Sequence, residues 1–309
     1  MRTFAITGVC GYIGSLLAEK LAALPDTCVV GLDVKPSCNL KQIKYRQVDI
    51  RGKKLSTTLK KDKVDTLVHL AFYTAPEGNE EEARSINVAG TANVLAAART
   101  AQVKRFVLAS SAAAYGSHSN NPVPFKESDP LKANDYFYYS AHKARQEELV
   151  QQFIAENPGI QTVILRPCVV IGPHINNDTG KSMRQKVLVN MKVPVPIQFI
   201  YEDDVAEAFF LAATGTQTGV YNVGTDGTLT ITEIGRIMKK RVVLLPFKAL
   251  YWLASVGKLL RVSPVSGKTV EFISNPIVVD PKKFRQTFGF HPQYDTAGAL
   301  KKFAASLNF

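Results

Sequence analysis

The first half of the chain alternates short runs of β-branched and aromatic residues with longer stretches in which apolar residues recur every three or four positions. The short runs predict strands at residues 3–8, 28–33, 44–50, 64–72, 105–111 and 162–167. The longer stretches predict helices at residues 14–24, at residues 80–101 and around Tyr139. Strands that alternate with helices are joined by right-handed crossovers, so they run parallel and are covered by helices on both faces. The pattern therefore predicts an α/β fold, a Rossmann-like doubly wound parallel sheet.

The alternation becomes irregular after Arg166, where prolines follow at positions 167, 173, 194 and 196. We expect residues 1–165 to form the main domain and residues 166–309 to form mainly a smaller, discontinuous C-terminal lobe. Segments at about 197–225 and 275–285 are expected to return to the main domain, because "GVYNVGT" (219–225) again has the pattern of a sheet strand.

The composition is that of an ordinary globular protein, with 46% hydrophobic and 21% charged residues among 309. The four cysteines, at positions 10, 28, 38 and 168, have neither the spacing of a metal site nor the density of a disulfide scaffold. We therefore expect no metal and a reducing, cytoplasmic location. The N-terminal residues lead directly into the first strand pattern, and no secretory signal is expected.

The net charge of +12 raises the question of an anionic partner. The densest basic cluster, residues 51–63, lacks aromatic residues between its charges, so it predicts a solvated helix or loop and no nucleic acid partner. The most apolar segment, residues 242–260, is interrupted by Pro246, Lys248 and Lys258. It is expected to form an amphipathic helix over a substrate cleft and not to span a membrane, with weak membrane contact as the alternative.

Glycines at positions 8, 11 and 14 lie in "TGVCGYIG", between the first predicted strand and the first predicted helix. Glycine permits a tight turn and the close approach of backbone amides to a pyrophosphate. The amino end of the helix adds free N–H groups and a positive dipole end. Strand, turn and helix together predict a dinucleotide site.

Two acidic residues follow later strands of the same domain. Asp33 ends the second strand, where a carboxylate can accept hydrogen bonds from the adenosine ribose hydroxyls and repel a 2′-phosphate. NAD is therefore preferred over NADP, although Lys35 can offset the repulsion. Asp49 follows the third strand and is expected to accept a hydrogen bond from the adenine amino group. A simple turn residue is the alternative for each.

Tyr139 and Lys143 are four residues apart in a predicted helix and thus lie on the same helical face. A nearby ammonium and a positively charged nicotinamide would lower the pKa of the Tyr139 phenol, which would then exchange a proton with a substrate hydroxyl near neutral pH. Ser110 and Ser111 end a strand on the carboxyl edge of the sheet, where a hydroxyl can bond a substrate oxygen. Taken singly, an exposed helix pair and two turn serines remain the alternatives.

Further motifs accompany these residues in a fixed order. They are "HLAF" (69–72), "NVAGT" (87–91), "SSAAAYG" (110–116), "YSAHK" (139–143), "LRPCVVIGP" (165–173), "QFIYEDDVAEA" (198–208), "YNVGT" (221–225) and "VVDPKKFRQTFGFHP" (278–292). With the glycine motif, Asp33 and Asp49, they resemble the extended short-chain dehydrogenase/reductase superfamily, in its NAD-dependent epimerase/dehydratase branch. The resemblance covers nearly the whole chain and is to enzymes similar to nucleotide-sugar 4-epimerases.

The resemblance implies an NAD-binding Rossmann domain, a substrate-binding C-terminal lobe and a catalytic set of Ser111, Tyr139 and Lys143. Tyr139 would be the acid/base and Lys143 its partner. His69 is expected to lie in the cofactor floor and not to bind a metal. The expected partners are a small-molecule substrate and, in a homodimer, a second copy of the chain. The residues expected to bind the cofactor are Gly8, Cys10, Gly11, Tyr12, Ile13, Gly14, Asp33, Asp49, Ile50, Leu70, Ala71, Asn87, Ser110, Tyr139, Lys143 and Pro167.

Departures from the family pattern bear on the substrate. The positions at which dehydratases remove a proton and expel water hold Ala112 and Ala113, so sugar 4,6-dehydration is disfavoured. Two polar positions of nucleotide-sugar enzymes, an Asn and a Tyr, hold Val169 and Ile171. No arginine is assigned to a substrate diphosphate, and solvated surface is the alternative for every candidate. The candidates are Arg236, Arg241 and Arg261.

Three functions remain compatible with these residues. The first is an NAD-dependent oxidoreductase or epimerase that acts on a secondary alcohol, of a nucleotide sugar or related carbohydrate, by Ser/Tyr/Lys hydride-transfer chemistry. The second is a reductase of an apolar alcohol or ketone, similar to a 3β-hydroxysteroid dehydrogenase, which the apolar segment 242–260 favours. The third is a non-catalytic regulator that senses NAD(P), against which the Tyr139–Lys143 pair argues.

Overall fold

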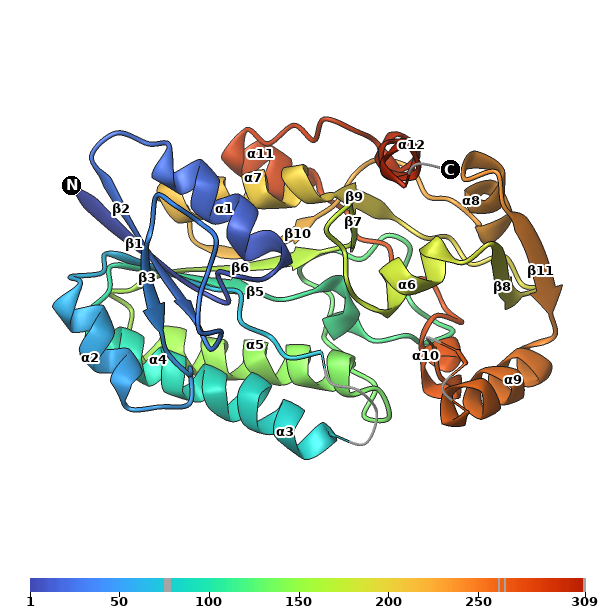
Figure 1. Cartoon of the computed structure of the whole chain (residues 1–309), viewed down its shortest axis with the longest axis horizontal. Helices are drawn as coiled ribbons and strands as arrows, with labels where there is room; N and C mark the ends of the chain where they lie inside the picture. Colours follow the sequence, from blue (N-terminus) through green and yellow to red (C-terminus); the bar gives the residue numbers. More distant parts are fainter. Residues whose placement is uncertain (75–78, 261, 264, 308–309) are drawn as a thin grey trace.

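Seven parallel strands form the central sheet of the protein (Figure 1), for which a computed structural model describes residues 1–74, 79–260, 262–263 and 265–307. The strands are β1 (Arg2–Thr7), β2 (Thr27–Asp33), β3 (Lys44–Gln47), β4 (Thr66–His69), β5 (Arg105–Ala109), β6 (Gln161–Pro167) and β10 (Gly219–Val223). Their order is β10-β6-β5-β4-β1-β2-β3, so the direction of strand addition reverses beside β1. Ligands of such sheets bind outside the carboxyl ends of the strands at this reversal. The predicted doubly wound α/β sheet is confirmed.

Helices cover both faces of the sheet (Figure 1). One face carries α1 (Tyr12–Ala22), α7 (Glu202–Thr214) and α11 (Lys282–Phe288), and the other carries α2 (Lys54–Lys61), α3 (Glu80–Arg84), α4 (Gly90–Thr100) and α5 (Tyr138–Glu156). Successive side chains of a strand point to opposite faces. Phe4 and Ile6 of β1 therefore enter one core cluster, and Ala5 between them enters the other. Burial on both faces explains why these strands are apolar throughout.

The predicted helix over residues 80–101 is interrupted by a π-helical turn at Ser85–Ala89. Asn87 in this turn is fully buried, and its amide side chain satisfies both backbone groups of Tyr73. The Tyr73 N–H donates to the Asn87 oxygen (2.7 Å), and the Asn87 NH₂ donates to the Tyr73 carbonyl (2.9 Å). The wider turn lets Asn87 reach the loop after β4, and π turns of this kind concentrate at functional sites.

The second half of the chain adds two small parallel sheets. In one, β7 (Val169–Ile171) pairs with β9 (Phe199–Tyr201), and in the other, β8 (Val187–Met191) pairs with β11 (Arg241–Leu245). The further helices of the described residues are α6 (Asp178–Arg184), α8 (Ile231–Ile237), α9 (Phe247–Leu259), α10 (Gly267–Phe272) and α12 (Thr296–Ser306), and a 3₁₀ turn follows β5 at Ala112–Tyr115. Because β10 pairs with β6, residues 219–223 lie in the central sheet. The division of the chain into two domains stays a prediction.

Residues 242–260 do not form the single helix expected of them. Pro246 separates β11 from α9, because its ring lacks an N–H and suits the start of a helix. Within the residues that the structure describes, no helix has both the length and the apolar character needed to cross a bilayer.

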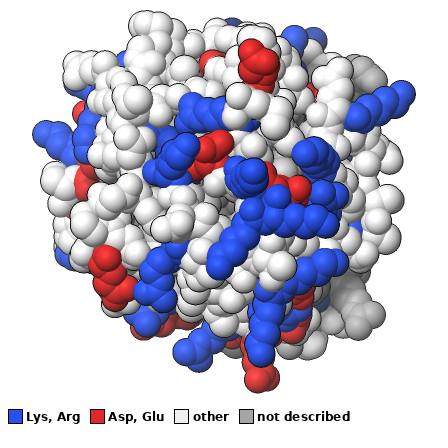
Figure 2. Space-filling view, turned by 90° about the vertical axis from the view of Figure 1, so that its left-hand side faces the viewer, with Lys and Arg blue, Asp and Glu red and all other residues white. Residues whose placement is uncertain are grey.

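The basic cluster at residues 51–63 forms α2 and its flanks, with Lys53, Lys54, Lys60 and Lys61 all exposed. Figure 2 views the molecule from the end opposite α9, and Lys and Arg side chains there have Asp and Glu side chains among them. This is the solvated helix predicted from the sequence.

Candidate active site at the carboxyl ends of the sheet strands

The glycine loop connects β1 to α1 and packs closely on the loop after β4. Gly8 has a φ of +72°, and a Cβ added to it would lie 2.8 Å from the Cα of Ala71, so glycine is required there. The same Cβ would meet Leu70, the neighbouring predicted cofactor residue. Gly11 precedes α1 without a side-chain cap, and the first turn of α1 holds no acidic residue. The free N–H groups and positive dipole end of α1 therefore suit an anionic pyrophosphate.

The other residues of the glycine loop enter the two adjoining cores. Gly14 is buried, and Cys10 and Ile13 pack against the core cluster on the α1 face of the sheet. Tyr12 instead packs against the cluster that contains Phe199 of β9 and Phe303 of α12. Burial raises the pKa of the Tyr12 phenol, and the Glu202 carboxylate raises it further. The loop therefore links the central sheet to the second half of the chain.

Asp33 lies beside the glycine loop, as a ribose-binding acid would. Its carboxylate accepts hydrogen bonds from the Cys10 N–H (3.0 Å) and from the Lys35 N–H (3.2 Å). The Lys35 ammonium donates to the Cys10 carbonyl (3.2 Å), so a positive charge also borders the loop. The structure thus brings together the two groups with opposite preferences for a 2′-phosphate.

Asp49 has a protein partner where the sequence predicts the adenine amino group. Its carboxylate accepts hydrogen bonds from the Arg51 backbone N–H (2.8 Å) and guanidinium (2.7 Å). These bonds hold the pKa of Asp49 below its usual value. Ile50 is buried against Gly90, where an added Cβ would lie 2.7 Å from its Cδ1. In the structure Asp49 is thus paired with Arg51 and Ile50 packs against Gly90, and contact of either residue with the cofactor stays a prediction.

Tyr139 and Lys143 face the same point from the first turns of α5, and Phe72 lies between them. The Lys143 ammonium lies 4.0 Å from the centre of the Phe72 ring, and that ring meets the Tyr139 ring edge to face at 5.1 Å. The ammonium also donates to the carbonyl of Ala109, the last residue of β5 (2.6 Å). Because Phe72 follows Ala71, the pair is connected through adjacent contacts to Gly8 of the glycine loop.

Ser111 completes the predicted catalytic set. It precedes the 3₁₀ turn, and its hydroxyl accepts a hydrogen bond from the Ala113 N–H (3.1 Å). A side-chain hydrogen bond between Ser111 and Tyr139 lowers the pKa of the phenol, whereas burial raises it and is the larger influence. The expectation that Tyr139 titrates near neutral pH rests on both the Lys143 ammonium and a positively charged nicotinamide, and it stays a prediction. The hydrogen bond from Ser111, and not the Lys143 ammonium, opposes the effect of desolvation on the Tyr139 phenol.

Burial also explains the state of Lys143, which is only 4% exposed. Removing the ammonium from water lowers its pKa to about 7, and the Glu147 carboxylate opposes that shift. Lys143 is thus poised between its charged and neutral forms near physiological pH. A lysine that is only partly protonated stabilises a neighbouring phenolate less than the fully charged lysine that the sequence pattern suggests.

Ser110 does not share the surroundings of Ser111. Its hydroxyl donates a hydrogen bond to the buried Glu147 carboxylate. The same carboxylate accepts hydrogen bonds from two nitrogens of Arg166, the shorter of which is 2.6 Å. Arg166 in turn donates to the Tyr115 hydroxyl (2.8 Å). Ser110, predicted to bind the cofactor, therefore belongs to a buried polar network behind the site. Glu147 lies four residues after Lys143, so helical spacing is the signal that links this network to the pair.

His69 and the buried Asn87 serve the framework around the site. The Thr91 hydroxyl donates its proton to the Asn87 carbonyl (2.7 Å), so it accepts a hydrogen bond from His69 Nε2 (2.9 Å). In the neutral ring Nδ1 then lacks a proton and accepts from the Thr7 hydroxyl (2.7 Å). Burial lowers the pKa of His69 to about 3, so the ring is neutral. Pro167, the last predicted cofactor residue, ends β6 and is buried.

The other described positions that were expected to bear on the substrate lie in the core or on the surface of the protein. Ala112 is buried, and Ile171 lies in the core cluster of the second half, with Val169 packed against it. Arg236 and Arg241 are exposed on α8 and at the start of β11, and Arg261 lies outside the described residues. The described part of the chain holds no group of His, Cys, Asp and Glu side chains arranged to bind a metal.

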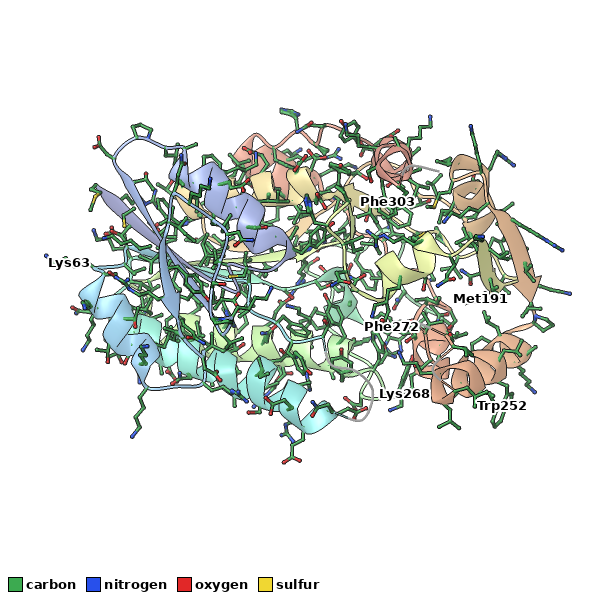
Figure 3. All side chains as sticks on the ribbon, in the orientation of Figure 1. Lys63, Met191, Trp252, Lys268, Phe272 and Phe303 are labelled. Atoms are coloured by element: carbon green, nitrogen blue, oxygen red, sulfur yellow. The ribbon has the colours of Figure 1, made fainter. Side chains whose placement is uncertain are left out.

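Sequence reasoning missed the aromatic surroundings of Tyr139. Phe137, two residues before Tyr139, stacks on Phe272 of α10 with ring centres 4.2 Å apart. Figure 3 shows Phe272 on the side of α10 that faces the rest of the molecule. This contact joins the start of α5 to the α9–α10 pair. An aromatic at each position is visible in the sequence, but pairing residues so far apart requires the fold.

Several known proteins are similar to this chain. The model of a family described as "NAD dependent epimerase/dehydratase family" matches residues 4–224. An uncharacterized protein of Mycobacterium tuberculosis is 25% identical over 97% of this chain and 82% of its own length. A ketoreductase of Stigmatella aurantiaca that acts on a farnesyl-bearing dihydroquinoline oxide is 32% identical, over 56% of this chain and 51% of its own. The solved UDP-glucose 4-epimerase of Thermus thermophilus, complexed with NAD, has a TM-score of 0.77 and 22% identity, covering 99% of each chain.

Proposed function

Because the chain belongs to the NAD dependent epimerase/dehydratase family, we propose that it oxidises or reduces a secondary alcohol, with a nucleotide sugar or a related carbohydrate as substrate. One observation carries the proposal. Tyr139 is hydrogen-bonded to Ser111, and both Tyr139 and Lys143 contact the ring of Phe72, directly beside the glycine loop. A regulator that only binds the dinucleotide has no need of this arrangement.

NAD is the proposed cofactor, and the described residues fit it. The close packing of Gly8 on Ala71 and the uncapped amino end of α1 leave backbone N–H groups for a pyrophosphate. Asp33, held by the Cys10 N–H, would bind the adenosine ribose. Lys143 would release the Ala109 carbonyl, or share it, to bond the nicotinamide ribose. When bound, NAD supplies the hydride acceptor and donor for the reaction.

The proton chemistry is assigned to the protein. Tyr139 would take the hydroxyl proton when the alcohol is oxidised to a ketone and return it when the ketone is reduced. Ser111 would hold the substrate oxygen, and its hydrogen bond favours the charged phenolate. In an epimerase the ketone rotates within the site and is reduced from its other face, whereas in a dehydrogenase the ketone is released as product. Both outcomes use the same three groups.

Sugar 4,6-dehydration is not proposed. That reaction needs an acid and a base beyond the alcohol oxidation, and Ala112 and Ala113 offer neither. Ala112 is buried as part of the core on the α1 face, so its side chain serves packing.

A reductase of an apolar ketone or alcohol is the second candidate. It is favoured by the farnesyl-bearing substrate named for the Stigmatella relative and by the apolar surroundings of Val169 and Ile171. The two candidates differ in what the substrate lobe must hold: a diphosphate requires cations within the site, whereas an isoprenoid or steroid requires an apolar lining.

The test is a substrate screen with matched variants. Nucleotide sugars, hydroxysteroids and isoprenoid ketones are incubated with NAD or NADH, and both NADH absorbance and chromatographic separation of epimers are followed, because epimerisation leaves no net NADH. Tyr139→Phe should lose about 10²- to 10⁴-fold in rate while its NAD affinity stays unchanged. Undiminished turnover in Tyr139→Phe would contradict the proposed mechanism.

Two further expectations accompany this proposal. A homodimer stays a prediction, which light scattering on the purified chain tests. A cytoplasmic location is also proposed, supported by the four cysteines, all of which are unpaired.

A further inference from the structure

The positive charge of the chain is concentrated in two segments, residues 179–201 and 234–270, which we call the cationic unit. The first segment contains four Lys and Arg residues, the second contains eight, and neither contains an Asp or Glu. The chain as a whole has 38 basic and 26 acidic residues, so everything outside the cationic unit is neutral in sum. The net charge of +12 therefore belongs to this unit.

The two segments fold together. β8 of the first pairs with β11 of the second, and α9 packs on β8 and on α10. The Lys240 ammonium donates to the Met183 carbonyl (2.6 Å), which adds a second link. Figure 1 shows α8, β8, β11, α9 and α10 at the end of the molecule away from β1, β2 and β3. The opposite end, seen in Figure 2, has acidic side chains among the basic ones.

The cationic unit also exposes apolar side chains. Of the fifteen large hydrophobic residues that are exposed in the described part of the chain, eleven lie between Val187 and Val262. On α9 they form a stripe with helical spacing: Trp252 (67% exposed), Leu253 (60%), Val256 (50%) and Leu259 (82%). Figure 3 shows Trp252 projecting from α9 away from the rest of the molecule.

Unlike an ordinary surface helix, α9 carries apolar side chains on its outward side as well as on its inward side. Its inward side buries the small Ala254 and Leu250 against β8 and α10, and its outward side carries the larger apolar residues. Apolar patches of this kind on soluble proteins mark surfaces that meet a partner. The exposed Lys248 precedes Trp252 by four residues and so lies beside the stripe, and the exposed Lys192 directly follows β8, on which α9 packs.

We infer that the outward face of α9 docks on an anionic membrane surface. Apolar side chains enter the boundary between headgroups and acyl chains, Trp252 takes the interfacial position that indole prefers, and the lysines and arginines around them meet anionic headgroups. A helix of thirteen residues is about 20 Å long, so it lies on the surface and does not cross a hydrocarbon core of about 30 Å.

The charge pattern separates this occupant from a second copy of the chain. A two-fold interface presents the same surface from both partners, so docking two copies through α9 would set one cationic unit against the other. Nucleic acid would satisfy the cations but would leave the apolar stripe in water. An anionic bilayer satisfies both, because it offers acyl chains and negative headgroups in one plane.

Trp252 provides a direct measurement, since it is the only tryptophan of the chain. The full-length protein is mixed with vesicles of phosphatidylcholine alone and with vesicles containing about 30% phosphatidylglycerol. With the anionic vesicles we expect a blue shift of the emission, quenching by brominated acyl chains, and weakening of both effects as salt is raised. With phosphatidylcholine alone the spectrum should change little.

Matched charge reversals locate the surface. Lys192→Glu/Lys248→Glu should weaken vesicle binding by about tenfold or more. Lys60→Glu/Lys61→Glu, which makes the same change in net charge on α2, should bind nearly as wild type. Leu253→Ser/Leu259→Ser keeps all charges and Trp252 but should abolish the quenching by brominated chains. All six side chains are exposed, so the fold should persist in each variant.

Several outcomes would overturn the inference: no spectral change with anionic vesicles, equal binding to neutral vesicles, or an equal loss in the α2 variant. A shift that depends on protein concentration without vesicles would assign α9 to self-association instead. A shift produced by an acidic polypeptide but not by vesicles would assign it to a protein partner. Tyr139→Phe should bind vesicles normally, so the result is independent of the proposed reaction.

Discussion

The ammonium of Lys143 rests on the face of the Phe72 ring, and the edge-to-face contact of the same ring with Tyr139 makes Phe72 the common neighbour of both groups. The ring has two consequences for Lys143. It keeps water away, which favours the neutral amine, and it presents a negative π face, which favours the ammonium. Phe72 therefore helps to set the charge of Lys143 without taking part in proton transfer.

Replacing Phe72 separates these influences. Phe72→Leu keeps an apolar residue but removes the π face, whose attraction for a cation amounts to about 0.5–2 kcal/mol, equivalent to about 0.4–1.5 pKa units. We expect the pKa of Lys143 to fall below its present value of about 7. Nuclear magnetic resonance of lysine labelled with ¹³C at Cε measures it directly. Phe72→Tyr, which keeps an aromatic face, should leave it nearly unchanged, and an unaltered or higher pKa in Phe72→Leu would contradict the assignment.

The buried ammonium also predicts a pH-dependent stability. Burial lowers the pKa of Lys143 from 10.5 to about 7, so between these values the unfolded chain binds more protons than the folded one. Stability then rises with pH, and the cost of burying the charge is fully present below about pH 7. Lys143→Met should therefore be more stable relative to wild type at pH 6 than at pH 10.

Thermal denaturation of the cofactor-free proteins across this range is the measurement. Lys143→Met also loses the bond to the Ala109 carbonyl, about 1 kcal/mol, but that loss is nearly constant with pH. Lys61→Met, at an exposed site, serves as the control and should show no such trend. A difference between Lys143→Met and wild type that stays flat or grows with pH would refute a depressed pKa.

The fold was largely predictable because local patterns determine it. The apolar runs of β1 and β5 reveal strands buried on both faces, and the glycines after β1 reveal the turn that precedes α1. Spacing alone also placed Tyr139 and Lys143 on one face of α5. These inferences need only the backbone periods of strands and helices.

The rest of the site depends on contacts between distant residues. No local pattern indicates that Phe72 meets Lys143, or that Ser110 bonds Glu147 while Ser111 bonds Tyr139. The pKa of Lys143 follows from burial, which a sequence does not specify. Likewise, the sequence of α9 is apolar on both sides and does not show which side stays exposed, because that depends on where β8 and α10 pack.

Cofactor choice should depend on two charges beside the glycine loop. Asp33 repels a 2′-phosphate and Lys35 attracts it, so we expect NAD to bind more tightly than NADP. Asp33→Asn keeps an acceptor for the Cys10 N–H but removes the negative charge, so it should reduce the ratio of NAD affinity to NADP affinity by about tenfold. Lys35→Ala should increase that ratio. Calorimetric titration with both oxidised cofactors decides, and tighter binding of NADP by the wild type would identify Lys35 as the dominant group.

The last prediction contrasts two adjacent serines. Ser111→Ala removes the hydrogen bond that lowers the pKa of Tyr139, so the phenol becomes harder to ionise. Because alcohol oxidation needs the phenolate as base, the pH at which its rate rises should move upward. Turnover should also fall, by about 10²- to 10³-fold if Ser111 holds the developing alkoxide. Ser110→Ala loses only its bond to Glu147, so it should keep the pH profile of the wild type.

The two variants are well matched for stability, which makes the comparison sharp. Ser111→Ala loses the cap of the 3₁₀ turn and Ser110→Ala loses a buried hydrogen bond, each about 1 kcal/mol. A general loss of stability would therefore lower both activities alike. Only the hydrogen bond between Ser111 and Tyr139 predicts that one variant shifts the pH–rate profile and the other does not. Identical profiles in the two would remove Ser111 from the catalytic set.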